Sequence, residues 1–261
     1  KIVNAIHHLD GKVEIGIVGK YTDLKDAYIS IVESLNHGGY YFKKNVNLTW
    51  INSELMEESC PENNILFNVD GILVPYGFGA RGINGKINAI KCAREKKIPF
   101  LGICLGMQCA VIEFGRNVLG LKDANSTEFD PDTGNPVIDI MHEQKNVEDM
   151  GGTMRLGSYE CRLKVGSKAH EAYQKKIVYE RHRHRYELNN DYWGRFEKAG
   201  LIITGINPDK NLAEIVEIKD HPWFVAVQFH PEFKSRPDRP HPLFRDFIGA
   251  SIKHSSSAKR K

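Results

Sequence analysis

The stretch from Pro99 to Gln108 constrains the fold of this chain more than any other. Apolar residues lead to Cys104, which has a glycine two positions before it and another two positions after it. This order predicts a buried strand, a sharp turn and a helix, with the cysteine at the tip of the turn. Gly102 and Gly106 have no Cβ, so they allow the strand and the helix to approach each other closely.

Cys104 is therefore predicted to be a nucleophile, because the start of a helix favours the thiolate form of a cysteine. A free cysteine is more often a small buried apolar residue. We keep that interpretation for the other four, which are Cys60, Cys92, Cys109 and Cys161. Five cysteines without paired spacing also favour a reducing, cytoplasmic location over a disulfide scaffold.

Size and charge restrict the class of protein further. With 261 residues, of which 41% are hydrophobic, the chain can form one large α/β domain with a substantial core. No apolar run has the roughly 18 to 20 residues that a membrane span needs. Four basic residues beyond position 250 account for the net charge of +3. The nearly neutral remainder does not favour binding to nucleic acid.

The pattern of apolar residues predicts a domain over residues 13–252, preceded by a linker at 1–12 and followed by a disordered basic tail at 253–261. Strands are expected at 13–20, 46–51, 69–75, 137–141, 154–165, 177–188, 201–206, 212–218 and 224–229, and one before Cys104. Helices are expected at 24–35, where Asp23 caps the start and His37-Gly38-Gly39 ends the helix, and at 83–97, 169–174, 189–198 and 242–252. The early alternation of strand and helix predicts a mainly parallel sheet with its reactive loops at the carboxyl ends of the strands. The segment at 154–165 should be antiparallel.

The loop from Gly77 to Gly82 is rich in glycine and allows two interpretations. One is a phosphate site, although the lysine and hydroxyl of a P-loop are missing. The other is a loop whose backbone N–H groups act as donors beside Cys104. We favour the second, because neighbouring parallel strands would bring both loops to the same edge of the sheet.

A basic run lies in the predicted strand at 177–188. Arg181, Arg183 and Arg185 alternate with His182 and His184, so the three arginines should share one face. A solvated edge strand would explain this pattern. Alternatively, at least one arginine binds a carboxylate with its planar guanidinium.

A cysteine nucleophile needs a base, and the base needs an acceptor that orients it. His230 ends the apolar strand at 224–229, and Glu232 follows two residues later. In an extended backbone these two side chains would project to the same side, so the carboxylate could accept from one imidazole nitrogen while the other faces the sulfur. We therefore predict that His230 and Glu232 complete a triad with Cys104.

Two of these motifs together, 102–108 and 230–232, resemble the class I glutamine amidotransferases. Three further stretches resemble the glutaminase domain of the CTP synthase family, at 124–129, 151–157 and 180–186. The resemblance runs in order from about Val13 to Phe247. It implies a flavodoxin-like α/β fold, a three-layer sandwich around a mainly parallel central sheet.

The resemblance also implies residue roles. Cys104 would be the nucleophile, with His230 and Glu232 completing the triad. Glutamine would be held by Gly77, Leu105, Gly106, Met107, Gln108, Glu128 and Arg185. Within this set, Glu128 can accept from the substrate ammonium and Arg185 can pair with its α-carboxylate, while the N–H groups of Gly77 and Leu105 would stabilise an oxyanion.

As a reaction, the resemblance implies hydrolysis of L-glutamine to glutamate and ammonia. The ammonia would pass to an N-terminal synthetase domain, joined through residues 1–12, which uses ATP and Mg²⁺ to aminate UTP to CTP. GTP would be an allosteric activator. The glutaminase domain itself would need no metal or cofactor, and the full-length protein would be a homotetramer without nucleic-acid or membrane partners.

One residue departs from the family pattern. The family loop usually reads Pro-Gly-Gly-Phe-Gly, and here Tyr76 stands at the first glycine. If that position requires a positive φ, a tyrosine there would be strained or would move the loop. Two alternatives therefore stay open: a glutamine-binding module with impaired catalysis, and another γ-glutamyl hydrolase of the same fold.

Overall fold

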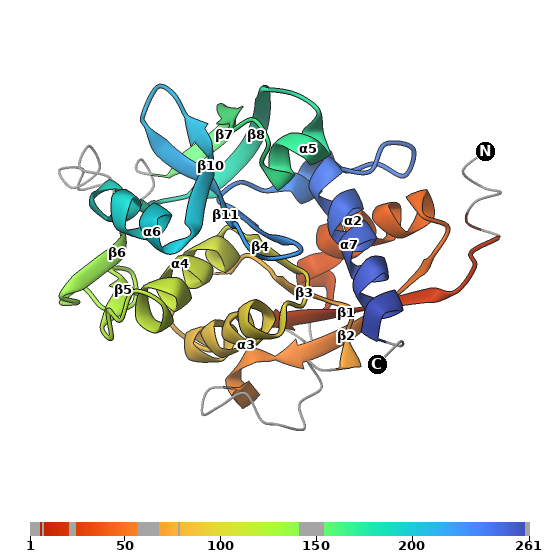
Figure 1. The fold of residues 1–261 in the computed structure, drawn as a ribbon, viewed down its shortest axis with the longest axis horizontal. Helices are drawn as coiled ribbons and strands as arrows, with labels where there is room; N and C mark the ends of the chain where they lie inside the picture. The colour runs from red at the N-terminus through yellow and green to blue at the C-terminus, as the bar shows by residue number, and fades with distance from the viewer. Residues whose placement is uncertain are drawn as a thin grey trace.

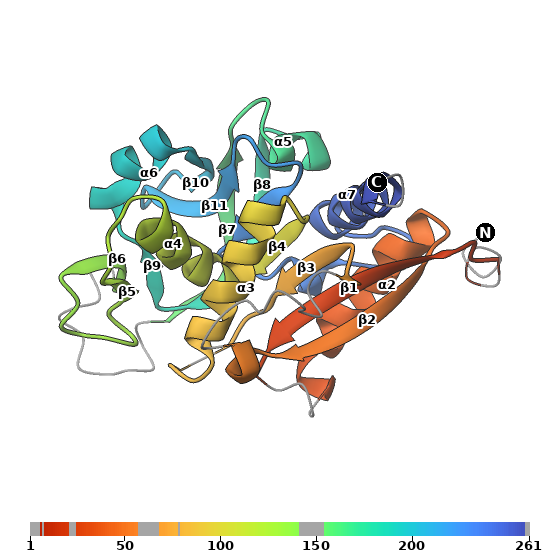
Figure 2. The same cartoon turned by 60° about the horizontal axis from the view of Figure 1, so that its bottom comes forward.

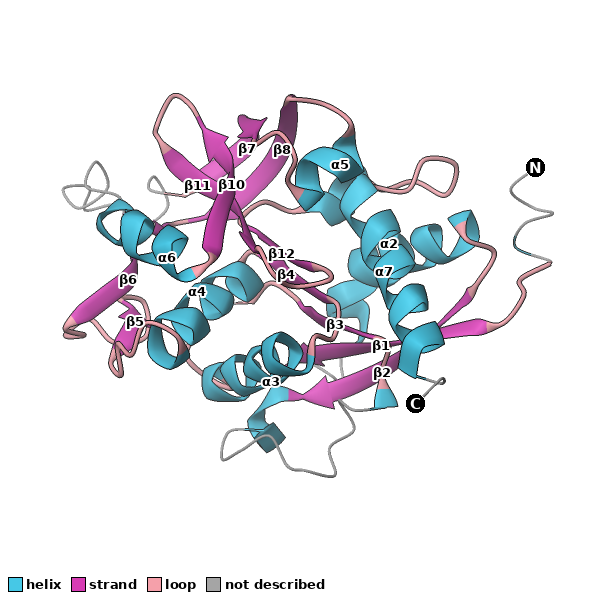
Figure 3. Ribbon diagram, in the orientation of Figure 1, coloured by secondary structure: helices cyan, strands magenta, loops and turns pink. Residues whose placement is uncertain are grey.

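The computed structural model describes residues 6, 8–20, 25–56, 68–77, 79–140 and 154–258. Its centre is a sheet of nine strands (magenta in Figure 3). These are β1 (Lys12–Gly19), β2 (Asn45–Asn52), β3 (Gly71–Val74), β4 (Phe100–Ile103), β7 (Arg155–Leu163), β8 (Ile177–His184), β10 (Leu201–Asn207), β11 (Leu212–Ile218) and β12 (Phe224–Val227).

The strand order is β2-β1-β3-β4-β12-β11-β10-β7-β8. From β2 to β12 all neighbours pair in parallel, and from β12 to β8 they pair antiparallel. The parallel arrangement expected from the early strand and helix alternation is confirmed, as is the antiparallel strand expected at 154–165.

A smaller sheet of three strands lies beside the first. It has the order β5-β6-β9 and consists of β5 (Ala124–Ser126), β6 (Asn135–Ile140) and β9 (Tyr186–Leu188). The prediction of one strand over 177–188 is wrong, because the chain leaves the large sheet after His184 and joins the small one at Tyr186. Burial of Glu187 breaks the alternation that a single strand would require. Arg185 is the residue between the two strands.

Helices cover both faces of the large sheet (Figures 1 and 2). The α-helices are α2 (Ile29–Tyr41), α3 (Ile83–Lys96), α4 (Leu105–Asn117), α5 (Lys168–Tyr173), α6 (Trp193–Ala199) and α7 (Pro242–Ala258). Short 3₁₀ helices are η1 (Lys25–Tyr28), η2 (Ser53–Met56), η5 (Asn190–Tyr192) and η6 (Pro231–Lys234). Because α3 and α4 pack on one face and α2 and α7 on the other, the fold is the expected three-layer sandwich.

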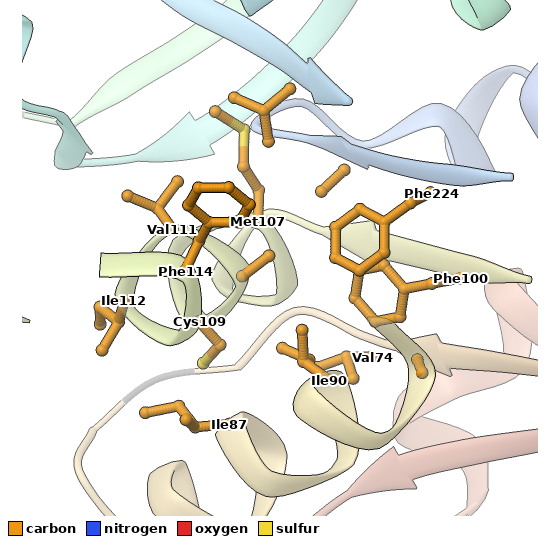
Figure 4. Close-up of a cluster of buried hydrophobic side chains, with 14 of the residues drawn as sticks. Val74, Ile87, Ile90, Phe100, Met107, Cys109, Val111, Ile112, Phe114 and Phe224 are labelled. Atoms are coloured by element: carbon orange, nitrogen blue, oxygen red, sulfur yellow. The ribbon is translucent and has the colours of Figure 1, made fainter. Parts of the chain in front are cut away.

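Side chains that alternate along the central strands feed two separate cores. Ile72 and Val74 of β3 join the core beneath α3 and α4, whereas Leu73 between them joins the core beneath α2 and α7. Figure 4 shows the first of these cores, in which the rings of Phe100 and Phe224 lie 4.4 Å apart between their centroids. This double-sided burial explains why β3 and β4 are apolar at every position.

Two predicted element ends are wrong. Helix α2 does not stop at His37 but continues to Tyr41, and Gly38 packs so closely that an added Cβ would lie 3.1 Å from the carbonyl oxygen of Phe244 in α7. The glycine therefore serves helix packing and not helix termination. Helix α7 extends to Ala258, so residues 253–258 are not a disordered tail. Asp23, residues 259–261 and most of the predicted linker at 1–12 lie outside the described residues.

The cysteines differ from expectation at one position. Cys104, Cys109 and Cys161 are free and buried, but Cys92 is disulfide-bonded, so it is not the free apolar residue that the sequence predicted. Cys60 lies outside the described residues. Within the described part of the chain, no helix combines the length and apolar character needed to cross a membrane.

The contact between α4 and β3 generates a prediction. An added Cβ on Gly106 would lie 2.1 Å from the carbonyl oxygen of Val74, which is backbone and cannot move aside cheaply. We expect Gly106→Ala to lower the free energy of unfolding by about 3 kcal/mol, as measured by urea denaturation.

Gly194 of α6 is a matched control, since a Cβ there would meet nothing within 4 Å. Gly194→Ala should leave stability unchanged or raise it by about 0.5 to 1 kcal/mol. Equal stability of the two variants would contradict the close approach of α4 to β3.

Candidate active site

The register of three parallel strands brings the predicted reactive residues together. β4 lies between β3 and β12, with Gly102 opposite Val74 and Ile103 opposite Val227. The carboxyl ends of the three strands are thus side by side. The Gly77 loop, Cys104 and His230 follow these ends in turn, which places them at one edge of the sheet.

Cys104 stands at the turn between β4 and α4. Its backbone has φ 53° and ψ −103°, a conformation that is rare for a residue with a side chain. The Cys104 N–H donates to the carbonyl of Val227 at 2.7 Å, and its own carbonyl accepts from the N–H groups of Met107 and Gln108. The strained turn predicted from the flanking glycines is therefore confirmed.

His230 and Glu232 are in direct contact. Nδ1 of His230 lies 2.7 Å from Oε1 of Glu232, and the His230 N–H donates to the carbonyl of Arg181 at 2.8 Å. The backbone between them is not extended, as the sequence analysis assumed. Pro231 begins the 3₁₀ helix η6, and this turn brings the Glu232 carboxylate back to the imidazole.

The surroundings of His230 favour its charged form. Burial lowers the pKa of the imidazole, but hydrogen bonding and charge from Cys104 and Glu232 outweigh burial and raise the pKa to about 10. The ring lies between Tyr76 and Phe233, at centroid distances of 5.2 and 5.6 Å. The site thus favours an imidazolium next to the sulfur.

A cavity of about 130 Å³ opens beside Cys104. It is lined by Gly77, Cys104, Gln108, Glu128, Met154, His184, Arg185 and Tyr186. Four of the predicted glutamine contacts are in this set, namely Gly77, Gln108, Glu128 and Arg185. Leu105, Gly106 and Met107 are buried in the first turn of α4 and do not line the cavity, so they can offer only backbone groups to a ligand.

The cavity carries opposite charges. Burial raises the pKa of Glu128, while the Gly79 N–H, 3.3 Å from its Oε1, and the charge of Arg185 counteract that rise. The Gly79 contact agrees with the donor interpretation of the glycine loop, because its N–H faces a carboxylate. Phe78 in this loop lies outside the described residues.

Several residues of the site carried no signal that the sequence analysis used. The side-chain amide of Gln228 donates to Sγ of Cys104 at 3.7 Å, and Gln108 donates to the carbonyl of Tyr186 at 3.1 Å. Met154, His184 and Tyr186 line the cavity. The position of Gln228 next to the carboxyl end of β12, opposite Cys104, was the one available sign.

Tyr76 does not enter the cavity. Its hydroxyl donates to the carbonyl of Ala27 at 2.6 Å, and its ring packs against Tyr28 as well as His230. Its φ is not positive, unlike that of Cys104 and four other non-glycine residues of the described chain. The strain expected at this position is therefore absent.

Within the described ranges, no group of three or more His, Cys, Asp or Glu side chains is arranged to hold a metal ion. The chemistry available at this edge is that of a thiol, an imidazole, a carboxylate and a small charged cavity. That combination suits acyl transfer through a covalent intermediate.

Comparisons with known proteins agree with this arrangement. The family model "Glutamine amidotransferase class-I" matches residues 23–250. A CTP synthase of Carboxydothermus hydrogenoformans is 63% identical over 93% of this chain and 45% of its own length, and that of Bacillus subtilis is 59% identical over 97% and 47%. The solved glutaminase domain of Trypanosoma brucei CTPS, with bound acivicin, is 39% identical, with a TM-score of 0.86 over 93% of this chain and 94% of that one.

The chain belongs to the class I glutamine amidotransferase family, as the glutaminase domain of a CTP synthase. It spans about half the length of the curated relatives that it matches. The resemblance inferred from the sequence motifs is confirmed.

The contact between Glu232 and His230 predicts a pH effect. Glu232→Gln removes one of the groups that raise the pKa of His230, so NMR titration of the imidazole should give a lower pKa than the wild-type value of about 10. Because the folded pKa exceeds the ordinary value of 6.5, this contact should stabilise the fold fully below pH 6.5 and lose its effect as pH rises toward 10.

Unfolding free energies measured across this range should therefore differ most between wild type and Glu232→Gln on the acidic side. Glu33 on the exposed face of α2 gives a control, since Glu33→Gln should leave the His230 titration unchanged. An unaltered titration in Glu232→Gln would mean that the carboxylate does not hold the imidazolium.

Proposed function

We propose that this chain hydrolyses L-glutamine to glutamate and ammonia through a γ-glutamyl thioester on Cys104. The observation that carries the proposal is the convergence of Cys104, His230 and Glu232 beside a cavity with a carboxylate and a guanidinium in its wall. Glutamine has an ammonium and a carboxylate at one end and an amide at the other, so its charges match those of the cavity.

In the first half-reaction the Cys104 thiolate attacks the amide carbon of glutamine. The backbone N–H groups of Gly77 and Leu105 stabilise the oxyanion that develops, and each such donor typically contributes about 3 to 4 kcal/mol. The carbon–nitrogen bond breaks as the His230 imidazolium gives its proton to the departing nitrogen, which leaves as ammonia.

In the second half-reaction water hydrolyses the thioester. The neutral imidazole of His230 takes a proton from the water as its oxygen attacks the acyl carbon, and the carbon–sulfur bond breaks to give glutamate and the thiolate. Glu232 keeps the imidazole oriented in both steps. Gln228 contacts the sulfur and can donate to it while it carries charge.

The ends of the substrate would be fixed by the charged residues of the cavity. Glu128 accepts from the α-ammonium, and Arg185 pairs with the α-carboxylate, for which its planar guanidinium is suited. The amide would then extend toward Cys104 and the Gly77 loop.

We propose further that the ammonia aminates UTP to CTP in the half of the relatives that this chain does not match. ATP, Mg²⁺ and UTP would bind to that half, GTP would activate the glutaminase step, and the whole protein would be a cytoplasmic homotetramer. Support for this comes from the CTP synthases that are 59% and 63% identical to the chain.

The two alternatives are less well supported. An impaired binding module would require Tyr76 to fill the cavity or strain the loop, whereas the ring lies outside the cavity lining and its φ is not positive. A different γ-glutamyl hydrolase is disfavoured by the high identity to CTP synthases over almost the whole chain.

Replacing the nucleophile tests the reaction. Cys104→Ala should abolish glutamate release from glutamine, and mass spectrometry should find no covalent adduct after incubation with a reactive glutamine analogue. Cys161→Ala is the control, because this free cysteine is buried away from the cavity, and it should retain activity and give the adduct. Full turnover by Cys104→Ala would refute the mechanism.

Replacing the arginine tests substrate binding. Arg185→Ala should raise KM for glutamine by about 100-fold with a smaller effect on kcat, since a charged hydrogen-bonding pair is worth about 1.5 to 3 kcal/mol. Arg183→Ala is matched in chemistry and lies two residues away on the exposed face of β8, so its KM should stay normal. A normal KM in both variants would leave the basic run as a solvated edge.

A further inference from the structure

A buried ring of charged and polar side chains lies behind the glutamine pocket and has no role in the mechanism above. Its members come from four strands of two sheets: Arg155 of β7, His182 and His184 of β8, Glu187 of β9 and Glu214 of β11. Four of the five belong to the stretches at 151–157 and 180–186 or follow directly, and these stretches distinguish the chain from other amidotransferases.

The contacts close on themselves. Arg155 donates to Oε1 of Glu214 at 2.7 Å and to Oε1 of Glu187 at 3.3 Å. Nδ1 of His182 and Nε2 of His184 share a hydrogen bond of 2.8 Å. Nε2 of His182 lies 3.3 Å from Oε2 of Glu214, and Nδ1 of His184 lies 3.4 Å from Oε1 of Glu187.

This ring holds the chain on both sides of Arg185. His184, the last residue of β8, is tied to His182 and also lines the cavity. Two residues after Arg185, Glu187 is tied to Arg155 across the junction of the two sheets. The direction of the Arg185 side chain therefore depends on contacts made by its neighbours and not only on its own.

We propose that this ring positions Arg185 and thereby sets the affinity of the pocket for the carboxylate of glutamine, an inference that rests on the proposed function. Within the ring the two carboxylates have different roles. Glu214, at the shorter distance, is the charged partner of Arg155, whereas Glu187, at the longer distance, is the protonated one.

The charges support this division. One guanidinium is balanced by one carboxylate, and a second buried carboxylate without a partner would be costly. Burial and the nearby charge of Glu214 raise the pKa of Glu187 well above its ordinary value, although Arg155 counteracts them. Burial also raises the pKa of Glu214, to about 7, with Arg155 again opposing the rise. Burial lowers the pKa values of both histidines, which keeps them neutral.

The test compares two isosteric variants, Glu187→Gln and Glu214→Gln, by their kcat and KM for glutamine. Glutamine at 187 imitates the protonated carboxyl, so KM should stay within about threefold of wild type. Glutamine at 214 leaves the guanidinium of Arg155 without its counter-charge, so KM should rise about tenfold or more, which corresponds to about 1.4 kcal/mol.

Alkylation of Cys104 by iodoacetamide provides a second measurement. This reagent needs the thiolate but not Arg185, so its rate should be the same in both variants if they fold and differ only in glutamine binding. Equal KM values in the two variants, or a parallel loss of alkylation and turnover in Glu214→Gln, would overturn the positioning role. If Glu214→Gln fails to fold, a raised KM in Glu187→Gln alone would overturn it.

The wild-type protein separates this inference from the proposed function. If wild type releases glutamate but both variants keep its KM, the ring does not position Arg185 and the glutaminase assignment stands. If wild type releases no glutamate, the proposed function fails first, and titration of glutamine by calorimetry with the same two variants still decides whether the ring sets affinity.

Discussion

The close approach of α4 to β3 is the constraint on which the site depends. Because Gly106 has no side chain, the first turn of α4 can lie against the carbonyl of Val74, and Cys104 is held at positive φ above the edge of the sheet. The strain of that residue persists because the strands on both sides fix it, and the Cys104 N–H bonds to Val227 of β12. A nucleophile held in this way needs no rearrangement before it reacts.

The two halves of the large sheet contribute differently. The parallel half supplies the reacting groups, since the Gly77 loop, Cys104 and His230 all follow the carboxyl ends of adjacent strands. The antiparallel half and the small sheet supply much of the pocket wall, including His184, Arg185 and Tyr186. This division fits a family in which the chemistry is shared and the substrate-binding surroundings can vary around it.

Tyr76 shows how a departure from a family motif can be accommodated. A tyrosine where relatives are expected to have glycine suggested a blocked or distorted pocket, yet its side chain turns toward Ala27 and packs against the imidazole of His230. The aromatic ring and Phe233 on its other side restrict the imidazole. The outcome depended on where the side chain points, and no property of the residue type indicates that.

Much of the site followed from local sequence because its chemistry is local. The glycines around Cys104 specify a turn, the apolar runs specify strands buried on both faces, and Glu232 lies close enough in sequence to His230 to reach it by either an extended or a turned backbone. The prediction of that pair was correct although the assumed backbone was not, because two residues of separation leave few ways for the side chains to avoid each other.

The sequence by itself determined the layer architecture, the triad and the charges at the two ends of the pocket, since each depends on residue type and short-range spacing. Only the tertiary structure decided that the strand at 177–188 divides at Arg185, that Gly38 serves helix packing, and that Arg155, Glu187 and Glu214 meet. These features depend on which groups are buried together, and burial of a charge is favourable only where a partner from a distant part of the chain is present to receive it.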